Sequence, residues 1–313
     1  MRRLLAKLFG ESQDAAAPAA ASAPAGWAER TWMSSDGLKL WARDYGGESG
    51  PARLPVICIH GLTRNSRDFE DVAPAIAAAG RRVLALDVRG RGRSAYDPNP
   101  TNYNPAVYAG DVAGLMSEAG IARAIFLGTS MGGLITMTLS TLRPDLIAGA
   151  ILNDIGPEIA TEGLTRIGSY VGSGGPAASW AEAAERTRAI NGSAQPHLTE
   201  ADWDRFARRT WREAEPGQLV LDYDPAIAQA FAAAPAGTPS PDLWPLFMAL
   251  AINRPMLLVR GGASDLLSEG TAARMQALAP QLRRVDLEGV GHAPTLDEPA
   301  ARQAIADFLA DAP

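Results

Sequence analysis

Short apolar runs alternate along this chain with segments of helical periodicity, and this alternation limits the possible folds more than any other feature. Residues 54–60 (LPVICIH) and 81–88 (RRVLALDV) are short runs rich in β-branched residues, as strands buried on both faces of a sheet are. The segment between them, residues 68–80, has helical spacing and ends in a glycine that can cap a helix. Further strand-like runs follow at residues 122–128, 147–154, 254–261 and 283–290. The pattern predicts an α/β fold with a mostly parallel sheet and helices on both faces.

The alternation stops between residues 156 and 245. This segment contains helical stretches at residues 179–190 and 200–211, and no convincing strand. Because a long structureless loop is rare in a compact domain, we predict a helical cap over the carboxyl edge of the sheet, formed by residues 156–245. The core then consists of residues 27–155 and 246–313.

The first residues of the chain have a different composition from the rest. Residues 11–26 form an Ala/Pro/Ser tract whose side chains are too small to pack a core, so residues 1–26 are predicted to be a disordered tail or linker. Lys7 interrupts the short apolar patch before this tract, so no secretory leader is expected. No segment approaches the ~18 consecutive apolar residues of a membrane span, and none is predicted.

The charge and cysteine content exclude several classes of protein. A net charge of −6 argues against a nucleic-acid-binding surface, which needs clustered basic residues. The single cysteine, Cys58, cannot form an intramolecular disulfide, and a cytoplasmic location is therefore expected. Either a monomer or a homodimer is compatible with the sequence.

Residues 128–132 (GTSMG) carry the strongest chemical signal. A serine between two glycines follows a predicted strand and precedes a predicted helix, which is the context of a strained turn that exposes a nucleophile. The residues two positions before and after the serine must be small for such a turn to form. We therefore predict that Ser130 is a nucleophile, although a plain glycine-rich turn is the competing interpretation.

A serine hydroxyl needs a base, and the chain has only three histidines. His60 ends the first buried strand, and His197 lies in a polar connection inside the predicted cap. His292 follows the last predicted strand, where the active sites of open α/β sheets collect. We predict that His292 is the base.

Two aspartates compete for the role of the acid that orients the base. Asp265 follows the strand that precedes the strand of His292, and Asp154 follows the strand after the serine helix. Both lie at the same edge of the sheet, and their spacing excludes neither. We favour Asp265 because it gives the chain order Ser, Asp, His and lies one strand from the base.

Two backbone N–H groups are predicted to stabilise the oxyanion that forms during acyl transfer. The N–H of Met131 lies at the start of the helix that follows Ser130, where anions are stabilised. The second donor is expected from Leu62, in the loop after the first buried strand, where Gly61 lets the backbone approach the acyl group.

No cofactor or metal is predicted. Gly90, Gly92 and Ala95 match a dinucleotide-binding pattern, but the prolines that follow prevent the helix that this pattern requires. No two histidines are close in sequence, and the chain has no clustered set of Cys and His ligands.

The motifs HGLTRN, LDVRGRGRS, GTSMGG, RGGASDLLS and GVGHAPTLDEP, in this order, resemble those of the α/β-hydrolase superfamily. The resemblance covers roughly residues 30–155 and 246–313. It implies an eight-stranded, mostly parallel sheet with a helical cap between core strands. It also implies a serine hydrolase whose triad is Ser130, Asp265 and His292.

Within that superfamily the chain is similar to carboxylesterases, enol-lactonases and meta-cleavage-product C–C hydrolases. We expect hydrolysis of a small, largely apolar ester or lactone, with C–C bond hydrolysis or cofactor-free perhydrolysis as alternatives. A ligand-binding receptor on the same fold is the alternative that is not an enzyme. Five aromatic residues favour an apolar pocket: Trp180, Trp203, Trp211, Trp244 and Phe247.

Two arginines near the predicted oxyanion loop have two possible roles. Arg64 and Arg67 can meet a substrate carboxylate, or they can pair with Asp68 and Asp71. The sequence favours arginines that are solvated or paired over arginines that bind the substrate.

Overall fold

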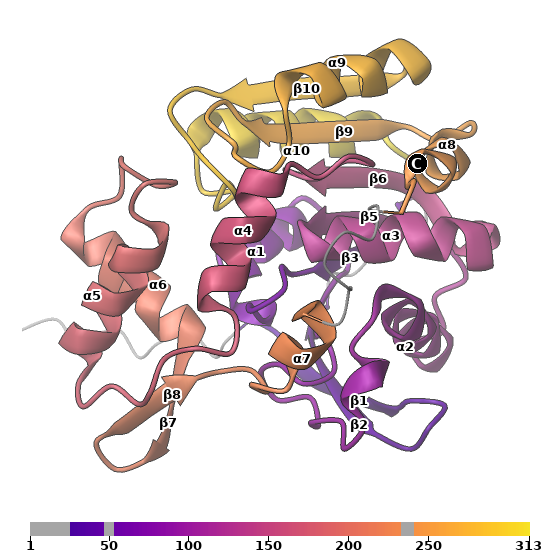
Figure 1. Cartoon of the computed structure of the whole chain (residues 1–313). Coiled ribbons are helices and arrows are strands. Elements are labelled where there is room, and N and C mark those ends of the chain that lie inside the picture. The colour runs from indigo at the N-terminus through magenta and orange to yellow at the C-terminus, as the bar shows by residue number, and fades with distance from the viewer. Residues whose placement is uncertain (1–25, 47–52, 233–240) are drawn as a thin grey trace, which may run out of the picture.

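The computed structural model describes residues 26–46, 53–232 and 241–313. Almost all of the predicted tail, residues 1–26, lies outside the described residues. An eight-stranded sheet forms the centre of the molecule, in the order β1-β2-β4-β3-β5-β6-β9-β10 (Figure 1). Its strands are β1 (Ala28–Met33), β2 (Lys39–Tyr45), β3 (Val56–Ile59), β4 (Val83–Asp87), β5 (Ala124–Thr129), β6 (Ile147–Asn153), β9 (Met256–Gly261) and β10 (Leu282–Leu287). The predicted mostly parallel sheet is confirmed.

The direction of the strands follows from the length of their connections. Every neighbouring pair from β4 to β10 is parallel, and each of these strands is joined to the next in the chain by a segment that contains a helix. Strands β1 and β2 form an antiparallel hairpin, and β2 pairs antiparallel with β4. The parallel strands therefore bring the loops that follow them to one edge of the sheet.

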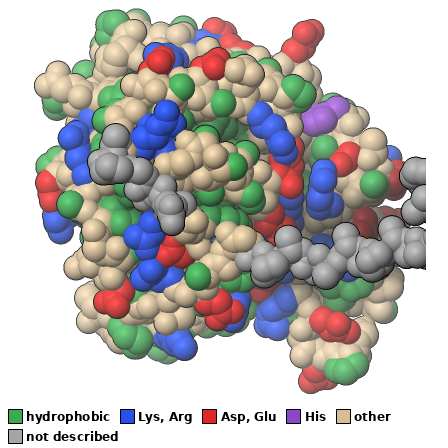
Figure 2. Space-filling view, turned by 180° about the vertical axis from the view of Figure 1, so that it is seen from behind, with side chains coloured by type: hydrophobic (Ala, Val, Ile, Leu, Met, Phe, Trp, Pro, Cys, Tyr) green, Lys and Arg blue, Asp and Glu red, His purple; other side chains and the backbone are tan. Residues whose placement is uncertain are grey.

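Helices cover both faces of the sheet, as the runs of buried apolar residues predict. The core helices are α1 (Val72–Ala78), α2 (Pro105–Glu118), α3 (Met131–Leu142), α8 (Trp244–Ala251), α9 (Glu269–Leu278) and α10 (Pro299–Asp311). One apolar cluster packs α2, α3, α8 and α9 against the sheet, and a second packs α1 and α10 against the opposite face. On the face of the molecule shown in Figure 2, acidic and basic side chains lie interspersed.

The segment between β6 and β9 forms an insertion, as its broken alternation predicts. Its helices are α4 (Thr161–Tyr170), α5 (Trp180–Asn191), α6 (Glu200–Thr210) and α7 (Ile227–Ala232). Figure 1 shows α5 and α6 side by side on the side of the molecule towards which the strands β6, β9 and β10 point. We call the segment from α4 to α7 the cap.

The cap also contains a feature that its sequence does not predict. Strands β7 (Trp211–Glu215) and β8 (Gln218–Leu221) form a hairpin that turns at Gly217, whose φ is +75°. Most of β7 is exposed and charged, so it lacks the apolar alternation of a strand. Trp211 and Leu219 instead anchor the hairpin in a small cluster with alanines of α5 and α6.

Candidate active site

Ser130 occupies a strained turn between β5 and α3. Its φ of 50° and ψ of −114° lie outside the regions that non-glycine residues usually adopt. A Cβ on Gly128 would lie 2.5 Å from the carbonyl carbon of Gly132, and one on Gly132 would lie 2.0 Å from the carbonyl oxygen of Ile59. Only glycine fits these two positions, and the turn has the geometry that the GTSMG motif predicts.

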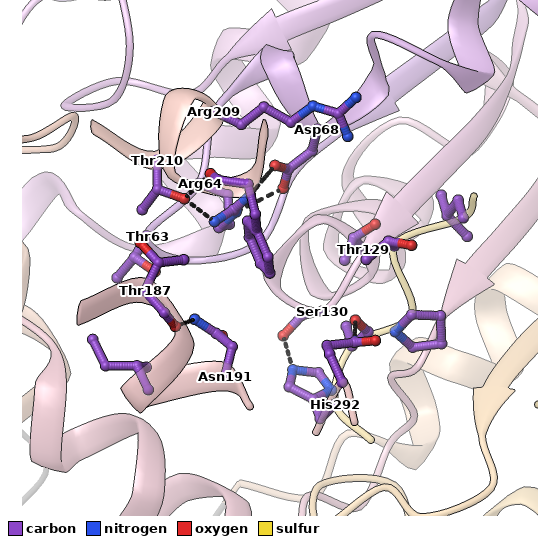
Figure 3. A pocket seen from close by; sticks show the side chains of 18 of the residues that line it. Thr63, Arg64, Asp68, Thr129, Ser130, Thr187, Asn191, Arg209, Thr210 and His292 are labelled. Atoms are coloured by element: carbon purple, nitrogen blue, oxygen red, sulfur yellow. Dashed lines mark hydrogen bonds and ion pairs between the residues drawn. The ribbon is translucent and has the colours of Figure 1, made fainter. Parts of the chain in front are cut away.

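A continuous chain of hydrogen bonds runs from this serine through a histidine to a buried aspartate. Nε2 of His292 lies 2.9 Å from Oγ of Ser130, and Nδ1 lies 2.8 Å from Oδ2 of Asp154 (Figure 3 shows the first of these contacts). The imidazole is largely buried, and the Asp154 carboxylate is fully buried. This is the order of contacts through which a histidine removes a proton from a serine hydroxyl.

The structure corrects the predicted acid. Asp265 does not bind Nδ1 of His292 but forms a two-pronged ion pair with Arg166 of α4, at 2.6 and 2.9 Å. The guanidinium of Arg166 holds the pKa of the Asp265 carboxyl below its usual range. Asp265 is therefore a contact between the core and the cap.

On the side away from His292, Asp154 is held by hydrogen bonds to β9 and to the loop that follows it. It follows the last residue of β6 directly, with a φ of 54°, and its N–H donates to the carbonyl oxygen of Val259 at 2.8 Å. Oδ1 accepts the N–H of Gly261 at 2.9 Å, and Oδ2 accepts the hydroxyl of Ser264 at 2.7 Å. These bonds fix the carboxylate at the sheet edge, facing the loop of His292. Asp154 lies one residue past the end of β6 and Asp265 four residues past the end of β9, a difference that does not by itself choose between them in the sequence.

The loop after β3 runs beside Ser130. A Cβ on Gly61 would lie 3.8 Å from Cβ of Ser130, so the backbone on either side of Gly61 borders the nucleophile. Within the described residues, neither the N–H of Leu62 nor that of Met131 donates a backbone hydrogen bond. The first N–H groups of a helix lack partners inside it, which leaves the Met131 N–H available. Leu62 and Met131 therefore adjoin Gly61 and Ser130, and their role as oxyanion donors stays a prediction.

His60 orients the peptide that carries the Leu62 N–H. Its Nδ1–H donates to the carbonyl oxygen of Gly61 at 2.7 Å, and its Nε2 accepts the Val88 N–H at 3.0 Å. Burial lowers the pKa of His60 to about 3, so the ring is neutral. Because the peptide is planar and trans, holding the Gly61 carbonyl also sets the direction of the Leu62 N–H.

A cavity of about 380 Å³ lies between this core and the cap, with Ser130 and His292 in its lining. Figure 3 shows Ser130 and His292 on one side of it and Thr187 and Asn191 of α5 on the other. The expectation of an apolar wall built by tryptophans is only partly met, because Trp211 alone among the five predicted aromatic residues is in the lining. Trp203 is buried against Phe206, with stacked rings 5.8 Å apart.

The arginines of the lining are already paired with carboxylates. Arg64 donates from Nε to both oxygens of Asp68 at 3.0 Å, as the sequence suggests, and its Nη1 donates to Thr210. Arg205 pairs with Asp202 at 2.7 Å, and Arg209 pairs with Asp71. Arg67, which is not in the lining, pairs with Asp222 rather than with Asp71. Within the described lining, no arginine is left without a carboxylate partner.

The cap also binds the loop that carries His292. The Gly291 N–H donates to the carbonyl oxygen of Ala194, and Nε2 of Gln195 donates to the carbonyl oxygen of Ala293, both at 2.6 Å. Gln195 is 2% exposed. The residues on both sides of His292 are therefore held by one connection between α5 and α6, which nothing in the sequence pattern indicates.

The described part of the chain contains no group of three or more His, Cys, Asp or Glu side chains placed to hold a metal ion. Among the helices that the structure describes, none is long and apolar enough to cross a membrane.

The fold agrees with what the comparisons show. Residues 55–299 match the family model described as alpha/beta hydrolase fold, and the chain belongs to this family. It is 34% identical to the 3-hydroxybutyrate-oligomer hydrolase of Cupriavidus necator, over 86% of this chain and 92% of that protein. It is 30% identical to the 2-(acetamidomethylene)succinate hydrolase of Mesorhizobium japonicum, over 78% of this chain and 82% of that one. The crystal structure of an alpha/beta hydrolase from Novosphingobium aromaticivorans has a TM-score of 0.85 and 45% identity, and the match covers 92% of this chain and 99% of that one.

Proposed function

We propose that the protein is a carboxylic ester hydrolase that works through an acyl-enzyme on Ser130. His292 takes the serine proton as Oγ attacks the carbonyl carbon, and Asp154 stabilises the imidazolium that forms. The N–H groups of Met131 and Leu62 bind the oxyanion. His292 then protonates the leaving alcohol and activates the water that releases the acid. The observation that carries this proposal is the unbroken chain from Ser130 Oγ through His292 to the buried carboxylate of Asp154.

The substrate that we propose is a small, largely apolar ester that carries one or two polar substituents. The cavity volume of about 380 Å³ suits a small molecule, and the hydroxyl and amide groups of its cap wall can bind ester or hydroxyl oxygens. Esters of short hydroxyalkanoic acids meet these conditions, and the similarity to a 3-hydroxybutyrate-oligomer hydrolase supports this class. A lactone of the same size presents the same carbonyl, and its leaving oxygen stays attached to the acyl group.

The test combines turnover with covalent labelling. The purified protein is assayed with p-nitrophenyl acetate, p-nitrophenyl butyrate, methyl 3-hydroxybutyrate and γ-butyrolactone, and is labelled with a fluorophosphonate probe. The matched control for Ser130→Ala is Ser117→Ala, which changes an exposed serine on α2. We expect Ser130→Ala to abolish both turnover and labelling and Ser117→Ala to leave both unchanged.

Two results would overturn the proposal. Equal labelling of the wild type and Ser130→Ala would remove the nucleophile. Binding of these esters without turnover or labelling of the wild type would instead point to a receptor on the same fold.

A further inference from the structure

Arg91 is a completely buried arginine directly behind the predicted oxyanion loop. It follows β4 in the LDVRGRGRS motif, and its relative exposure is 0%. Its Nε donates to the carbonyl oxygen of Leu62 at 2.9 Å, and its Nη2 lies 3.5 Å from Sδ of Met131. One side chain therefore contacts both residues whose N–H groups flank Ser130.

Arg91 forms its polar contacts with neutral groups in the part of the chain that the structure describes. Its Nη1 donates to the carbonyl oxygen of Arg89 and to the hydroxyl of Tyr108, both at 2.8 Å. The rings of Tyr103 and Tyr108 lie 5.6 and 5.0 Å from its guanidinium carbon. Within the described residues, no acidic side chain forms an ion pair with it.

Arg89, two residues earlier in the same turn, shows the contacts of a buried arginine with a structural role. It is also buried, but it pairs with Asp36, Asp97 and Asp111 at 2.6 to 2.8 Å. Burying a charge without a counter-ion is costly. The contrast with Arg89 therefore points to a role for the Arg91 charge other than pairing. An oxyanion is a negative charge that exists only during the reaction.

We propose that Arg91 is a positioning residue of the oxyanion hole, and that its charge also stabilises the oxyanion from behind the loop. This inference rests on the proposed function. Arg91 fixes the peptide between Leu62 and Thr63, and His60 fixes the preceding peptide, so the Leu62 N–H is held from both sides. A positive charge in a water-free site acts more strongly on a developing anion than it would in water.

Three variants separate the charge from the hydrogen bonds. Arg91→Lys keeps the charge, Arg91→Gln keeps a donor without the charge, and Arg91→Met keeps neither. Each is compared with the wild type for kcat and KM on an ester that the wild type hydrolyses. Each is also tested for binding of a trifluoromethyl ketone of the same acyl chain, which forms a tetrahedral adduct with an oxyanion. Circular dichroism and the thermal midpoint report whether each variant is folded.

We expect Arg91→Met to lower kcat about tenfold to a hundredfold, with KM changed less than about threefold, because the oxyanion forms in the transition state and is absent from the bound ester. The ketone should bind more weakly by the same factor as kcat/KM falls, whereas affinity for the neutral alcohol that the ester releases should not change. Arg91→Lys should retain more activity than Arg91→Gln. If Arg91 only supported the fold, its replacement would lower the thermal midpoint without selectively weakening the binding of the ketone.

The outcome distinguishes this inference from the function on which it rests. If the wild type hydrolyses esters and folded Arg91→Met matches its kcat/KM and ketone affinity within about twofold, the inference is wrong and the function stands. If Arg91→Met does not fold, Arg91→Lys and Arg91→Gln decide, and equal ketone binding by these two variants rules out the role of the charge. If the wild type neither hydrolyses esters nor binds the ketone, the proposed function and this inference both fail.

Discussion

The carboxylate of Asp154 lies 2.8 Å from Nδ1 of His292, although 138 positions separate the two residues in the sequence. They meet because β6 and β10 lie on the two sides of β9 in the sheet, and because the loops after parallel strands share one edge. Asp154 also accepts hydrogen bonds from Gly261 and Ser264, both of which follow or end β9. The Asp154 carboxylate is thus fixed by β6, by β9 and by the loop that follows β9.

Replacing Asp154 tests the assignment of the acid. We expect Asp154→Asn to lower kcat by about 10² to 10⁴, because an amide cannot stabilise the imidazolium or hold its tautomer. Asp265→Asn is the matched control and should leave kcat within about threefold, since its carboxylate binds Arg166. Steady-state kinetics on one p-nitrophenyl ester measures both. A larger loss of kcat in Asp265→Asn than in Asp154→Asn would show that Asp265 is the acid.

Replacing Gly132, two residues after Ser130, tests the steric argument for the turn. Gly132→Ala would place a Cβ 2.0 Å from the Ile59 carbonyl oxygen, so the strand or the turn must move. We expect a loss of several kcal/mol in unfolding free energy, or an inactive protein. Gly110→Ala, in the middle of α2 with open space around its Cβ, is the control and should be neutral or stabilising by up to about 1 kcal/mol. Urea unfolding measures both, and a Gly132→Ala protein as stable and active as the wild type would contradict the steric argument.

His60 predicts a dependence of stability on pH. Its pKa in the folded protein, about 3, lies below the usual 6.5, so between these values the unfolded chain binds a proton that the folded protein does not. The folding free energy should therefore weaken as the pH falls below about 6.5, by at most about 1.4 kcal/mol per pH unit for this group. Urea unfolding of the wild type and His60→Gln at pH 7.5, 6.0 and 5.0 isolates the contribution. The variant should be less stable at pH 7.5 and should have a shallower slope, and parallel curves would show that His60 is not the cause.

The pair between Arg64 and Asp68 predicts how the site responds to the charge of a substrate. Because Asp68 neutralises Arg64, we expect the wild type to prefer a neutral butyrate ester over a hemisuccinate ester of the same phenol. Asp68→Asn should reduce that preference about fivefold to tenfold, since the Arg64 charge becomes available to the substrate carboxylate. Asp204→Asn, which removes the exposed partner of Arg208, is the control and should not change the ratio. An unchanged ratio in Asp68→Asn would mean that Arg64 does not face the acyl group.

The sequence predicted the parts of the site that depend on local geometry. Ser130 sits in a turn that needs small residues at fixed positions, and His292 lies in the loop that follows the last strand, so each could be located from its own neighbours. Asp154 could not be separated from Asp265 in this way. What separates the two aspartates is the ion pair between Arg166 of α4 and Asp265. A contact between the cap and the core leaves no periodic pattern in the sequence, so it could not be predicted.

Two other features depend on tertiary context. The hairpin of β7 and β8 was not predicted because its exposed, charged residues do not alternate as a half-buried strand does. The three arginines of LDVRGRGRS look like a solvated basic turn, yet Arg89 and Arg91 are completely buried. Only the fold shows that one of them meets three carboxylates and the other meets the loop beside Ser130.

The contacts of Ala194 and Gln195 with the residues beside His292 have a consequence for redesign. In this protein the cap that lines the cavity also holds the loop of His292 in place, so under the proposed function selectivity and turnover are not separate modules. Exchanging the whole insertion for that of another hydrolase would remove both hydrogen bonds unless the graft keeps a carbonyl and an amide at these positions. Substitutions that accumulate in the insertion during evolution face the same constraint. A change of substrate range is therefore easier to reach by substitutions on the faces of α5 and α6 than by substitutions in the connection between them.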